Sequence, residues 1–447
     1  MKLFQRYGNS ENDRRCTVLH AVKYTAVFVI TLIVLWLMLT ASALIPNDAI
    51  RSNYEKSVYY YSDKDAFEFT SGKKLSAIAD NYADAIWLNV AWNMGEGNPV
   101  ISSVRTSYHN GGEFGVNSGL YFTVINGAQP NTEYNRYWHG TAMLIRVLHL
   151  FTDVSGIKII GFAVFIAFLV FSVLIIAKKH HDIALILVLS AAAVQIWNIR
   201  LSIEYQPSFL IAFMLIPLYV TFERKGDGYV KILSIISGVS VAFFDFLTTE
   251  TVTVLLPLAV VLAVRAKEKR LGAPKDAFEL TIKCGILWLA AYTGAFLIKW
   301  AAASCVAGTN VFEAAAQSAA VHLIGGNTAG IDINNRPKSF ISCIFANLTV
   351  LFGGTERVQY VRVAAGCVIC FAVIFSVWYL FHKKQENGNI TLLLGILGAV
   401  VFVRFLVLSN HSYVHEFFVY RALITPIFSL LTSVWLSVRG GEKRRRQ

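Results

Sequence analysis

Long apolar runs separated by short polar stretches dominate the chain. They are far longer than the strands of a soluble core, and most approach the roughly 20 residues that a helix needs to cross a bilayer. We therefore predict an all-α integral membrane protein, a polytopic bundle of about 10–11 transmembrane helices. The expected spans are residues 21–45, 157–177, 182–197, 208–221, 230–246, 251–264, 277–299, 360–381, 390–408 and 420–438.

One polar interruption is far longer than the others. The first apolar run ends near residue 45 and the next begins only near residue 157, so residues 47–155 form a loop of about 110 residues between the first two spans. No internal repeat or low-complexity linker divides the sequence. We therefore treat residues 1–447 as one integral membrane domain and the loop as part of it.

Amphipathic stretches within this loop predict interfacial helices. Residues 72–94 carry apolar positions at helical spacing, which predicts a helix lying on the membrane surface with Trp87 and Trp92 at headgroup level. A second amphipathic piece runs over residues 133–151 and contains His139 near its start. Between them the sequence is rich in Gly, Asn and Ser, which is typical of an irregular loop.

Charge sets the expected orientation in the membrane. The formal net charge is +12, yet Lys and Arg stand in short clusters between the apolar runs and at both chain ends. Such clusters are typical of cytoplasmic anchors, so we exclude a nucleic-acid partner. With ten spans all the clusters fall on one side, which places both termini and the basic tail, residues 439–447, in the cytoplasm and the long loop outside. The apolar stretch 339–353 is then expected to be a re-entrant or interfacial helix.

Asp48 follows the first span where the chain leaves the membrane. A carboxylate held there by the helix beneath it is partly desolvated, which suits a general base. The alternative interpretation is that Asn47 and Asp48 merely cap the segment that follows.

Three cations stand on the side opposite the cytoplasmic clusters, so the positive-inside rule does not explain them. Lys299, Arg404 and Arg421 lie in or next to apolar runs, and a lipid-linked phosphate at the outer surface would complement their charge. The alternative is that they snorkel to ordinary headgroups. Either interpretation makes membrane lipids partners of the chain.

Further polar residues on the expected outer side are candidates for binding an acceptor or a sugar. They are Asp80, Asp84, His139, Glu204, His411 and His415. Asp80 and Asp84 stand four residues apart, so they could also hold a divalent cation, or form a solvated helix face. Neither the histidines nor the six cysteines have a recognised zinc spacing, so we name no certain cofactor.

The order of these features resembles the GT-C superfamily of integral-membrane glycosyltransferases. The likeness rests on a basic N-terminus, a first helix followed by the acidic Asp48, a long external loop and about ten hydrophobic segments. It implies inverting transfer of a hexose or pentose from a polyprenyl-phosphate donor to a glycan, lipid or protein acceptor of the cell envelope, with Asp48 as base. Members of the family often carry a second acidic residue beside the first, and here Ala49 follows instead.

Two other classes of protein share some of these features. A transporter or flippase of a lipid-linked glycan is expected to show internal repeats and charges near the middle of the membrane, whereas here polar residues gather at one face. A polysaccharide polymerase or ligase would share the external site. We therefore favour an enzyme of polysaccharide biosynthesis in the cell membrane.

Overall fold

Seven helices are long and apolar enough to cross a membrane in the computed structural model, which describes residues 2–324, 336–351 and 388–445. Each coincides with one of the ten expected spans. The expected span 360–381 lies outside the described residues, and the remaining two are shorter helices, α8 (His181–Ala193) and α11 (Val252–Lys267). The seven candidate spans are Val18–Ala43, Val154–Ala177, Pro207–Lys225, Asp227–Phe244, Pro274–Ala307, Ile390–Val407 and Glu416–Leu436.

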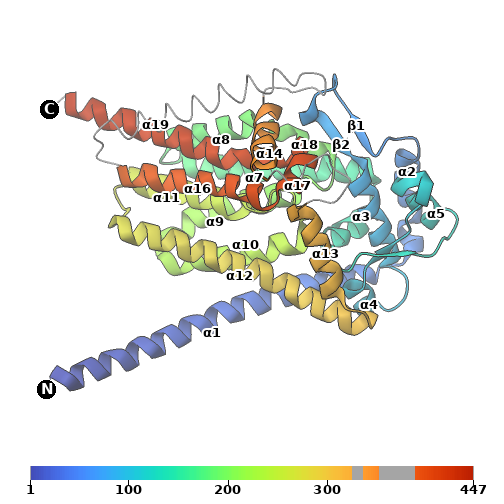
Figure 1. Ribbon diagram of the computed structural model, residues 1–447, viewed down its shortest axis with the longest axis horizontal. Helices are drawn as coiled ribbons and strands as arrows, with labels where there is room; N and C mark the ends of the chain where they lie inside the picture. The colour runs from blue at the N-terminus through green and yellow to red at the C-terminus, as the bar shows by residue number, and fades with distance from the viewer. Residues whose placement is uncertain (1, 325–335, 352–387, 446–447) are drawn as a thin grey trace.

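These helices run alongside one another as a bundle (Figure 1). Its centre is α11, in which every residue from Val252 to Arg265 is buried. Around it pack α9 (Pro207–Phe222), α16 (Gly388–Val407) and α19 (Ile424–Arg445), and α10 (Asp227–Phe244) packs against α12 (Pro274–Ala307).

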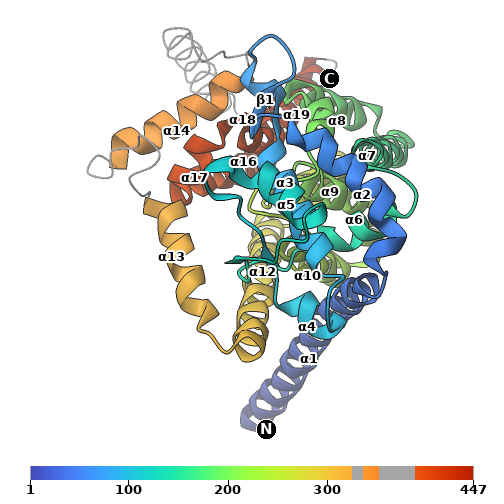
Figure 2. The ribbon, with the colours of Figure 1, turned by 90° about the vertical axis from the view of Figure 1, so that its right-hand side faces the viewer.

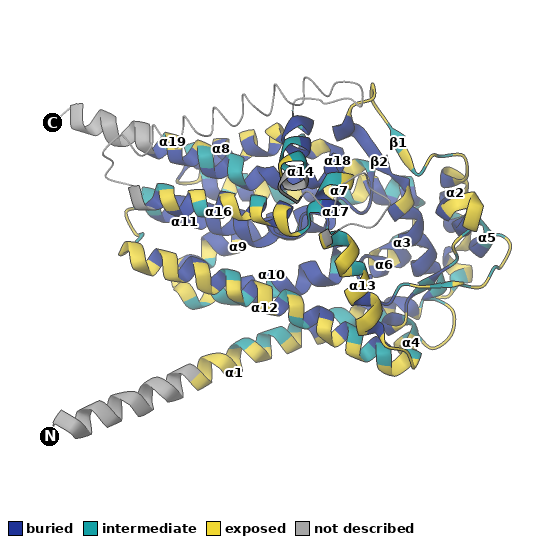
Figure 3. Ribbon diagram, viewed as in Figure 1, coloured by how far each residue is buried: buried dark blue, intermediate teal, exposed yellow. Residues whose placement is uncertain are grey.

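The outer helices expose apolar side chains. In α1 (Lys2–Ala43) and α7 (Val154–Ala177) most residues of the apolar run are not buried against protein, as the yellow and teal bands of α1 in Figure 3 illustrate. Water disfavours a continuous apolar surface of this length, whereas the hydrocarbon of a bilayer covers it without cost. The exposed surface therefore fits a membrane environment.

The long polar segment folds over one end of the bundle, and we call residues 44–153 the loop layer (Figures 1 and 2). Two antiparallel strand pairs, β1–β2 and β3–β4, tie it together. Its elements are α2 (Asn47–Ser62), β1 (Phe67–Phe69), η1 (Leu75–Ala77), β2 (Ile78–Asp80), α3 (Asn81–Asn93), α4 (Pro99–Val104), β3 (Ser107–Tyr108), η2 (Gly112–Phe114), α5 (Gly115–Val124), β4 (Thr132–Glu133) and α6 (Thr141–His149).

The loop layer shares one hydrophobic core with helices α1, α10 and α12. Trp87 of α3 stacks on Phe246, which follows α10, with ring centroids 3.9 Å apart. Trp138 donates a hydrogen bond from Nε1 to the carbonyl of Ala295 in α12 at 2.8 Å. At Gly140 an added Cβ would lie 2.2 Å from the ring of Phe243, so only glycine allows this approach. The layer is thus fixed to the bundle.

The surface helix expected over residues 72–94 is wrong in two respects. Helix α3 begins only at Asn81, because Asp80 caps it by accepting a hydrogen bond from the Ala83 N–H and because Ile78–Asp80 pairs with β1. Trp87 and Trp92 are buried in the shared core, not at headgroup level. Helical spacing identifies an apolar face but not whether lipid or protein covers it.

Both chain ends lie at the end of the bundle opposite the loop layer (Figure 1). Near the ends of α9 and α11 a salt-bridge network forms around Glu223, which contacts Arg265 at 2.9 Å and Arg270 at 2.6 Å. Asp182 at the start of α8 pairs with Lys267. Part of the basic charge that predicted a cytoplasmic side is therefore neutralised within the protein.

The late part of the chain adds helices that cross the side of the bundle. Helix α13 (Val311–Ile324) packs against α17 (Ser409–Val414), and α14 (Arg336–Val350) packs against both α17 and α18 (Glu416–Val419). At 15 residues α14 is about 22 Å long, shorter than the hydrocarbon core of a bilayer. The re-entrant or interfacial helix expected over 339–353 stays a prediction, since only part of that stretch is described.

Candidate functional site

Three acidic residues meet where the loop layer joins the bundle, and we call Asp80, Asp84 and Glu204 the carboxyl cluster. Asp80 ends β2 and Asp84 lies in the first turn of α3. Glu204 stands between η3 (Ile196–Leu201) and α9. All three are buried. Carboxylates are costly to bury unless they are paired, so their surroundings decide what they do.

Asp80 and Glu204 form a carboxyl pair. Burial raises the pKa of Asp80 to about 7 against the opposing effect of the Ala83 N–H, which donates to Oδ1 at 2.8 Å. The pKa of Glu204 is raised well above its usual range by burial and by the neighbouring charges of Asp80 and Asp84. A hydrogen bond joins the two side chains and favours ionised Asp80 with protonated Glu204. The pair therefore keeps one proton near neutral pH.

Asp84 is neutralised by a different set of groups. Its carboxylate lies 2.9 Å from Nζ of Lys158, accepts a hydrogen bond from the hydroxyl of Tyr61 at 2.9 Å, and accepts another from the N–H of Ile203 at 2.8 Å. Removing one partner of such a buried pair is far more costly than removing an exposed one. Asp84 and Lys158 therefore form a fixed ion pair that joins α3 to α7.

Arg421 is a buried cation with hydrogen-bond donors that no group of the described residues accepts. It belongs to η5 (Tyr420–Leu423), is only 1% exposed, and donates from Nη2 to the carbonyl of Ser76 at 3.1 Å. Its guanidinium lies 4.8 Å from the ring centre of Tyr205. Among the described residues no side chain forms an ion pair with Arg421, and its Nε and Nη1 lack a hydrogen-bond acceptor. These two donors remain available for an anion.

Tyr205 links the arginine to the carboxyl cluster. Its hydroxyl donates to the carbonyl of Ile78 at 3.0 Å, on the strand that ends at Asp80. The Asp80 backbone N–H in turn donates to the hydroxyl of Ser202 at 2.7 Å. These hydrogen bonds hold the segment around Glu204 against β2. The guanidinium of Arg421 lies over the ring of Tyr205, which belongs to the same segment.

An apolar groove of about 270 Å³ lies beside α7. Helices α6, α7 and α9 form its walls, with Leu144, Val164 and Met214 partly exposed along it. Ile203 and Gln206 also line it, and these residues flank Glu204 and Tyr205 in the sequence. The groove therefore lies on the apolar face of the bundle, and its lining includes sequence neighbours of Glu204 but no member of the carboxyl cluster itself.

Two of the three cations expected to bind a donor phosphate are used within the protein. Arg404 pairs with Glu250, Nε to Oε1 at 3.0 Å and Nη2 to Oε2 at 3.1 Å, and donates to Ser412 at 2.8 Å. The ammonium of Lys299 is buried, donates to the carbonyl of Val104 and lies over the ring of Trp138. Of the three, Arg421 has the most unused hydrogen-bonding capacity.

Replacing Glu250 by Ala is expected to destabilise the fold by about 3–5 kcal/mol, because it leaves the buried Arg404 charge without its bidentate partner. Thermal unfolding of the purified protein in detergent measures this. Glu250→Gln, which keeps an acceptor oxygen, should lose less. An unchanged melting temperature for Glu250→Ala would show that Arg404 is balanced by other groups.

Asp48, the residue expected to act as base, lies away from the carboxyl cluster and in an exposed position. Asp48 lies in the first turn of α2, its side chain is 90% exposed, and its carboxylate contacts Arg51 at 3.4 Å. Tyr61, which reaches the carboxyl cluster, stands 13 residues further along the same helix, or about 20 Å. Asp48 is therefore not a buried base, and it does not cap α2 either, because the N-cap residue is Pro46 and no side-chain capping hydrogen bond forms.

The histidines predicted to contact an acceptor lie in two places, where His139 and His411 are buried and His415 is half-buried. His139, whose φ is +56°, packs against Trp87 and Phe246, with Nε2 2.9 Å from the carbonyl of Tyr134. The His411 and His415 rings lie 4.7 Å apart between their centres, and His322 of α13 lies 5.2 Å from His411. Burial lowers the pKa of both His139 and His411, so both are neutral at pH 7.

The described residues contain no group of three or more His, Cys, Asp or Glu side chains placed to hold a metal ion. Of the two alternatives for Asp80 and Asp84, the solvated helix face is wrong, because both side chains are buried, and the cation site stays a prediction in which Lys158 already pairs with Asp84. Comparison of the chain with protein-family models, with curated proteins and with solved structures finds no match.

Sequence reasoning missed Lys158 and Tyr205. Lys158 is a lone charge one turn into an apolar run of 24 residues, and an ionisable group in such a run signals a functional or structural role. That signal was present in the sequence. Tyr205 carries no comparable signal, because its importance comes from lying beside Arg421, which is more than 200 residues distant.

Proposed function

We propose that the protein is a GT-C-type membrane glycosyltransferase that moves a sugar from a polyprenyl-phosphate donor to a glycan, lipid or protein acceptor on the outer face of the cell membrane. The observation that carries the proposal is the apolar groove whose lining includes Ile203 and Gln206, the residues that flank Glu204 and Tyr205 in the sequence. An isoprenoid chain lying in this groove brings its phosphate and sugar to the carboxyl cluster and toward Arg421. Such a ligand needs both an apolar channel and a cation at its end.

Arg421 binds the phosphate of the donor in this scheme. The bond that breaks joins the anomeric carbon to the phosphate oxygen, and negative charge gathers on the leaving polyprenyl phosphate. Nε and Nη1 of Arg421 are buried and have no acceptor among the described residues, so they are placed to donate to that charge. Fixed donors in a site that excludes water stabilise such charge strongly.

Asp80 acts as the general base. The acceptor hydroxyl attacks the anomeric carbon as the bond to phosphate breaks, and its proton passes to the Asp80 carboxylate. Protonated Glu204 hydrogen-bonds to Asp80 and keeps it ionised, while the Ala83 N–H orients it. Asp80 takes over the role that the family resemblance assigned to Asp48. Single-displacement transfer of this kind inverts the anomeric centre.

The transfer rate is expected to rise with pH and to level off above about pH 7. Only ionised Asp80 accepts the proton, and burial raises its pKa to about 7, so the active fraction grows as the pH approaches and passes that value. Initial rates between pH 5.5 and 8.5 at saturating donor measure this. A rate that falls with pH over this range would remove Asp80 from the role of base.

The class of activity is tested by offering the purified full-length protein, in lipid, a panel of radiolabelled polyprenyl-phosphate sugars together with cell-envelope glycans. Transfer of label to an acceptor supports the proposal. No transfer from any donor, combined with movement of the labelled lipid across vesicles that contain the protein, would identify a transporter or flippase instead.

A further inference from the structure

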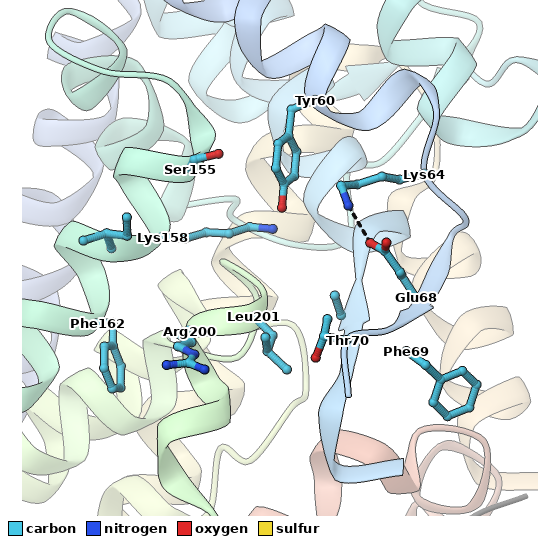
Figure 4. Close-up of a pocket in the computed structure, with 12 residues that line it drawn as sticks. Tyr60, Lys64, Glu68, Phe69, Thr70, Ser155, Lys158, Phe162, Arg200 and Leu201 are labelled. Carbon is cyan, nitrogen blue, oxygen red and sulfur yellow. Dashed lines mark hydrogen bonds and ion pairs between the residues drawn. The ribbon is translucent and has the colours of Figure 1, made fainter. Parts of the chain in front are cut away.

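A second cavity, of about 610 Å³, opens on another side of α7, and we call it the lateral cavity (Figure 4). The end of α2, strand β1, the first turns of α7 and the end of η3 enclose it. Nothing in the proposed transfer reaction uses it. The side chains that matter for its chemistry are Tyr60, Lys64, Glu68, Lys158, Phe162 and Arg200.

The polar wall of the lateral cavity carries an excess of positive charge. Lys64 lies 2.7 Å from Glu68, and the buried Lys158 lies 2.9 Å from Asp84. Arg200 is exposed and has no hydrogen bond or ion pair with any described residue. Three cations and one carboxylate therefore line the space, and one of the cations is unpaired. Such a wall favours an anion with oxygen acceptors.

The lining changes from polar to apolar along α7. Ser155 and Lys158 lie near the helix start, and Ile159 and Phe162 follow on the same face, as Figure 4 shows for three of them. Ile159 is 68% exposed and lies in the apolar run that we assign to the membrane. A soluble anion would contact only the polar part of this lining. An anionic lipid matches both parts, because its headgroup is charged and its chain is apolar.

We infer that the lateral cavity binds the phosphate headgroup of an anionic amphiphile, with its hydrocarbon chain along the outer face of α7 beside Ile159 and Phe162. Arg200 and Lys64 contact the phosphate, and the Tyr60 ring forms one wall. The inference concerns binding alone, so it stands or falls independently of glycosyl transfer.

The lateral cavity is separate from the apolar groove in which we place the chain of the sugar donor. The groove is lined by α7 residues 157, 161, 164 and 168, whereas the cavity is lined by residues 155, 158, 159 and 162. At about 100° per residue these sets face roughly opposite sides of the helix. One lipid therefore cannot occupy both sites without crossing α7. The lipid in the lateral cavity is a second molecule, distinct from the sugar donor.

Binding of three probes to the full-length protein in neutral detergent tests this inference. They are dioctanoyl phosphatidate, dioctanoyl phosphatidylcholine and inorganic phosphate, each titrated with a fluorescently labelled protein. We expect saturable binding of phosphatidate and no saturation by the other two. Arg200→Ala should raise the Kd for phosphatidate about tenfold, the effect of losing one charge-assisted contact. Arg51→Ala is the matched control and should leave the Kd unchanged.

Phe162→Ala separates the headgroup from the chain. It should weaken phosphatidate binding, because the chain loses an apolar contact. Several outcomes would overturn the inference: no saturation by phosphatidate, equal binding of phosphatidylcholine, an unchanged Kd in Arg200→Ala, or inorganic phosphate that binds as tightly as phosphatidate. The last result would identify the cavity as a site for soluble anions.

Discussion

Replacing Asp80 by Asn is expected to lower the transfer rate by at least a hundredfold while the protein remains folded. The amide cannot accept the proton of the acceptor hydroxyl, and general-base catalysis commonly contributes two to four orders of magnitude. Asn is also a good helix cap, so the hydrogen bond that starts α3 at Ala83 survives. Initial rates and thermal unfolding of the same preparations measure both effects.

The melting temperature of Asp80→Asn should equal or exceed that of the wild type. A buried carboxylate beside Asp84 is destabilising, and the neutral amide removes that repulsion. Asp48→Asn provides the comparison, since its exposed carboxylate lies far from the cluster. If Asp48→Asn loses transfer and Asp80→Asn keeps it, the base is Asp48 and the role of the carboxyl cluster is structural.

Replacing Arg421 by Ala is expected to lower kcat/KM for the donor by about a hundredfold to a thousandfold, the range seen when a fixed donor to developing charge is removed. The guanidinium donates to the Ser76 carbonyl through Nη2 alone, which leaves Nε and Nη1 for the phosphate. Steady-state kinetics with a short-chain polyprenyl-phosphate sugar measure the change.

Two further variants test whether the effect comes from the guanidinium of Arg421. Arg421→Lys should recover part of the lost activity, because lysine keeps the charge but not the paired donors of arginine. Lys56→Ala removes an exposed cation from α2 and should leave kcat/KM unchanged. If Lys56→Ala and Arg421→Ala weaken donor binding equally, the phosphate site lies elsewhere.

The helices that are long and apolar enough to cross a membrane could be predicted from the sequence because length and hydropathy alone define them. The expected span 157–177 differs by three residues from Val154–Ala177, and 390–408 by one from Ile390–Val407. Helix α11 shows the limit of this approach. Between Val252 and Val264 every residue of α11 is apolar except Thr253, as in a helix that faces lipid. The helix is nevertheless buried inside the bundle. Composition alone does not distinguish protein surroundings from lipid.

The candidate site could be predicted only in its parts. Asp80, Glu204 and Arg421 each stand out in the sequence as polar residues in a hydrophobic chain. The approach of Arg421 to Ser76 and Tyr205, which are near Asp80 and Glu204 in the sequence, depends on packing between segments up to 345 residues apart. A single sequence contains no direct record of such contacts. The position of Asp48 at the end of the first span predicts a base, whereas in the structure its side chain on α2 is exposed to solvent.

Lys158 lies between the carboxyl cluster and the lateral cavity, so its charge acts on both. Its ammonium lines the lateral cavity, and its charge lowers the pKa of Asp80. An anion in the cavity offsets part of the charge of Lys158, so Asp80 then holds its proton more tightly. Thermodynamic linkage makes the relation reciprocal: protonation of Asp80 strengthens binding of the anion by the same factor. If both proposed sites are occupied as we infer, one lysine in the first turns of α7 couples them through charge.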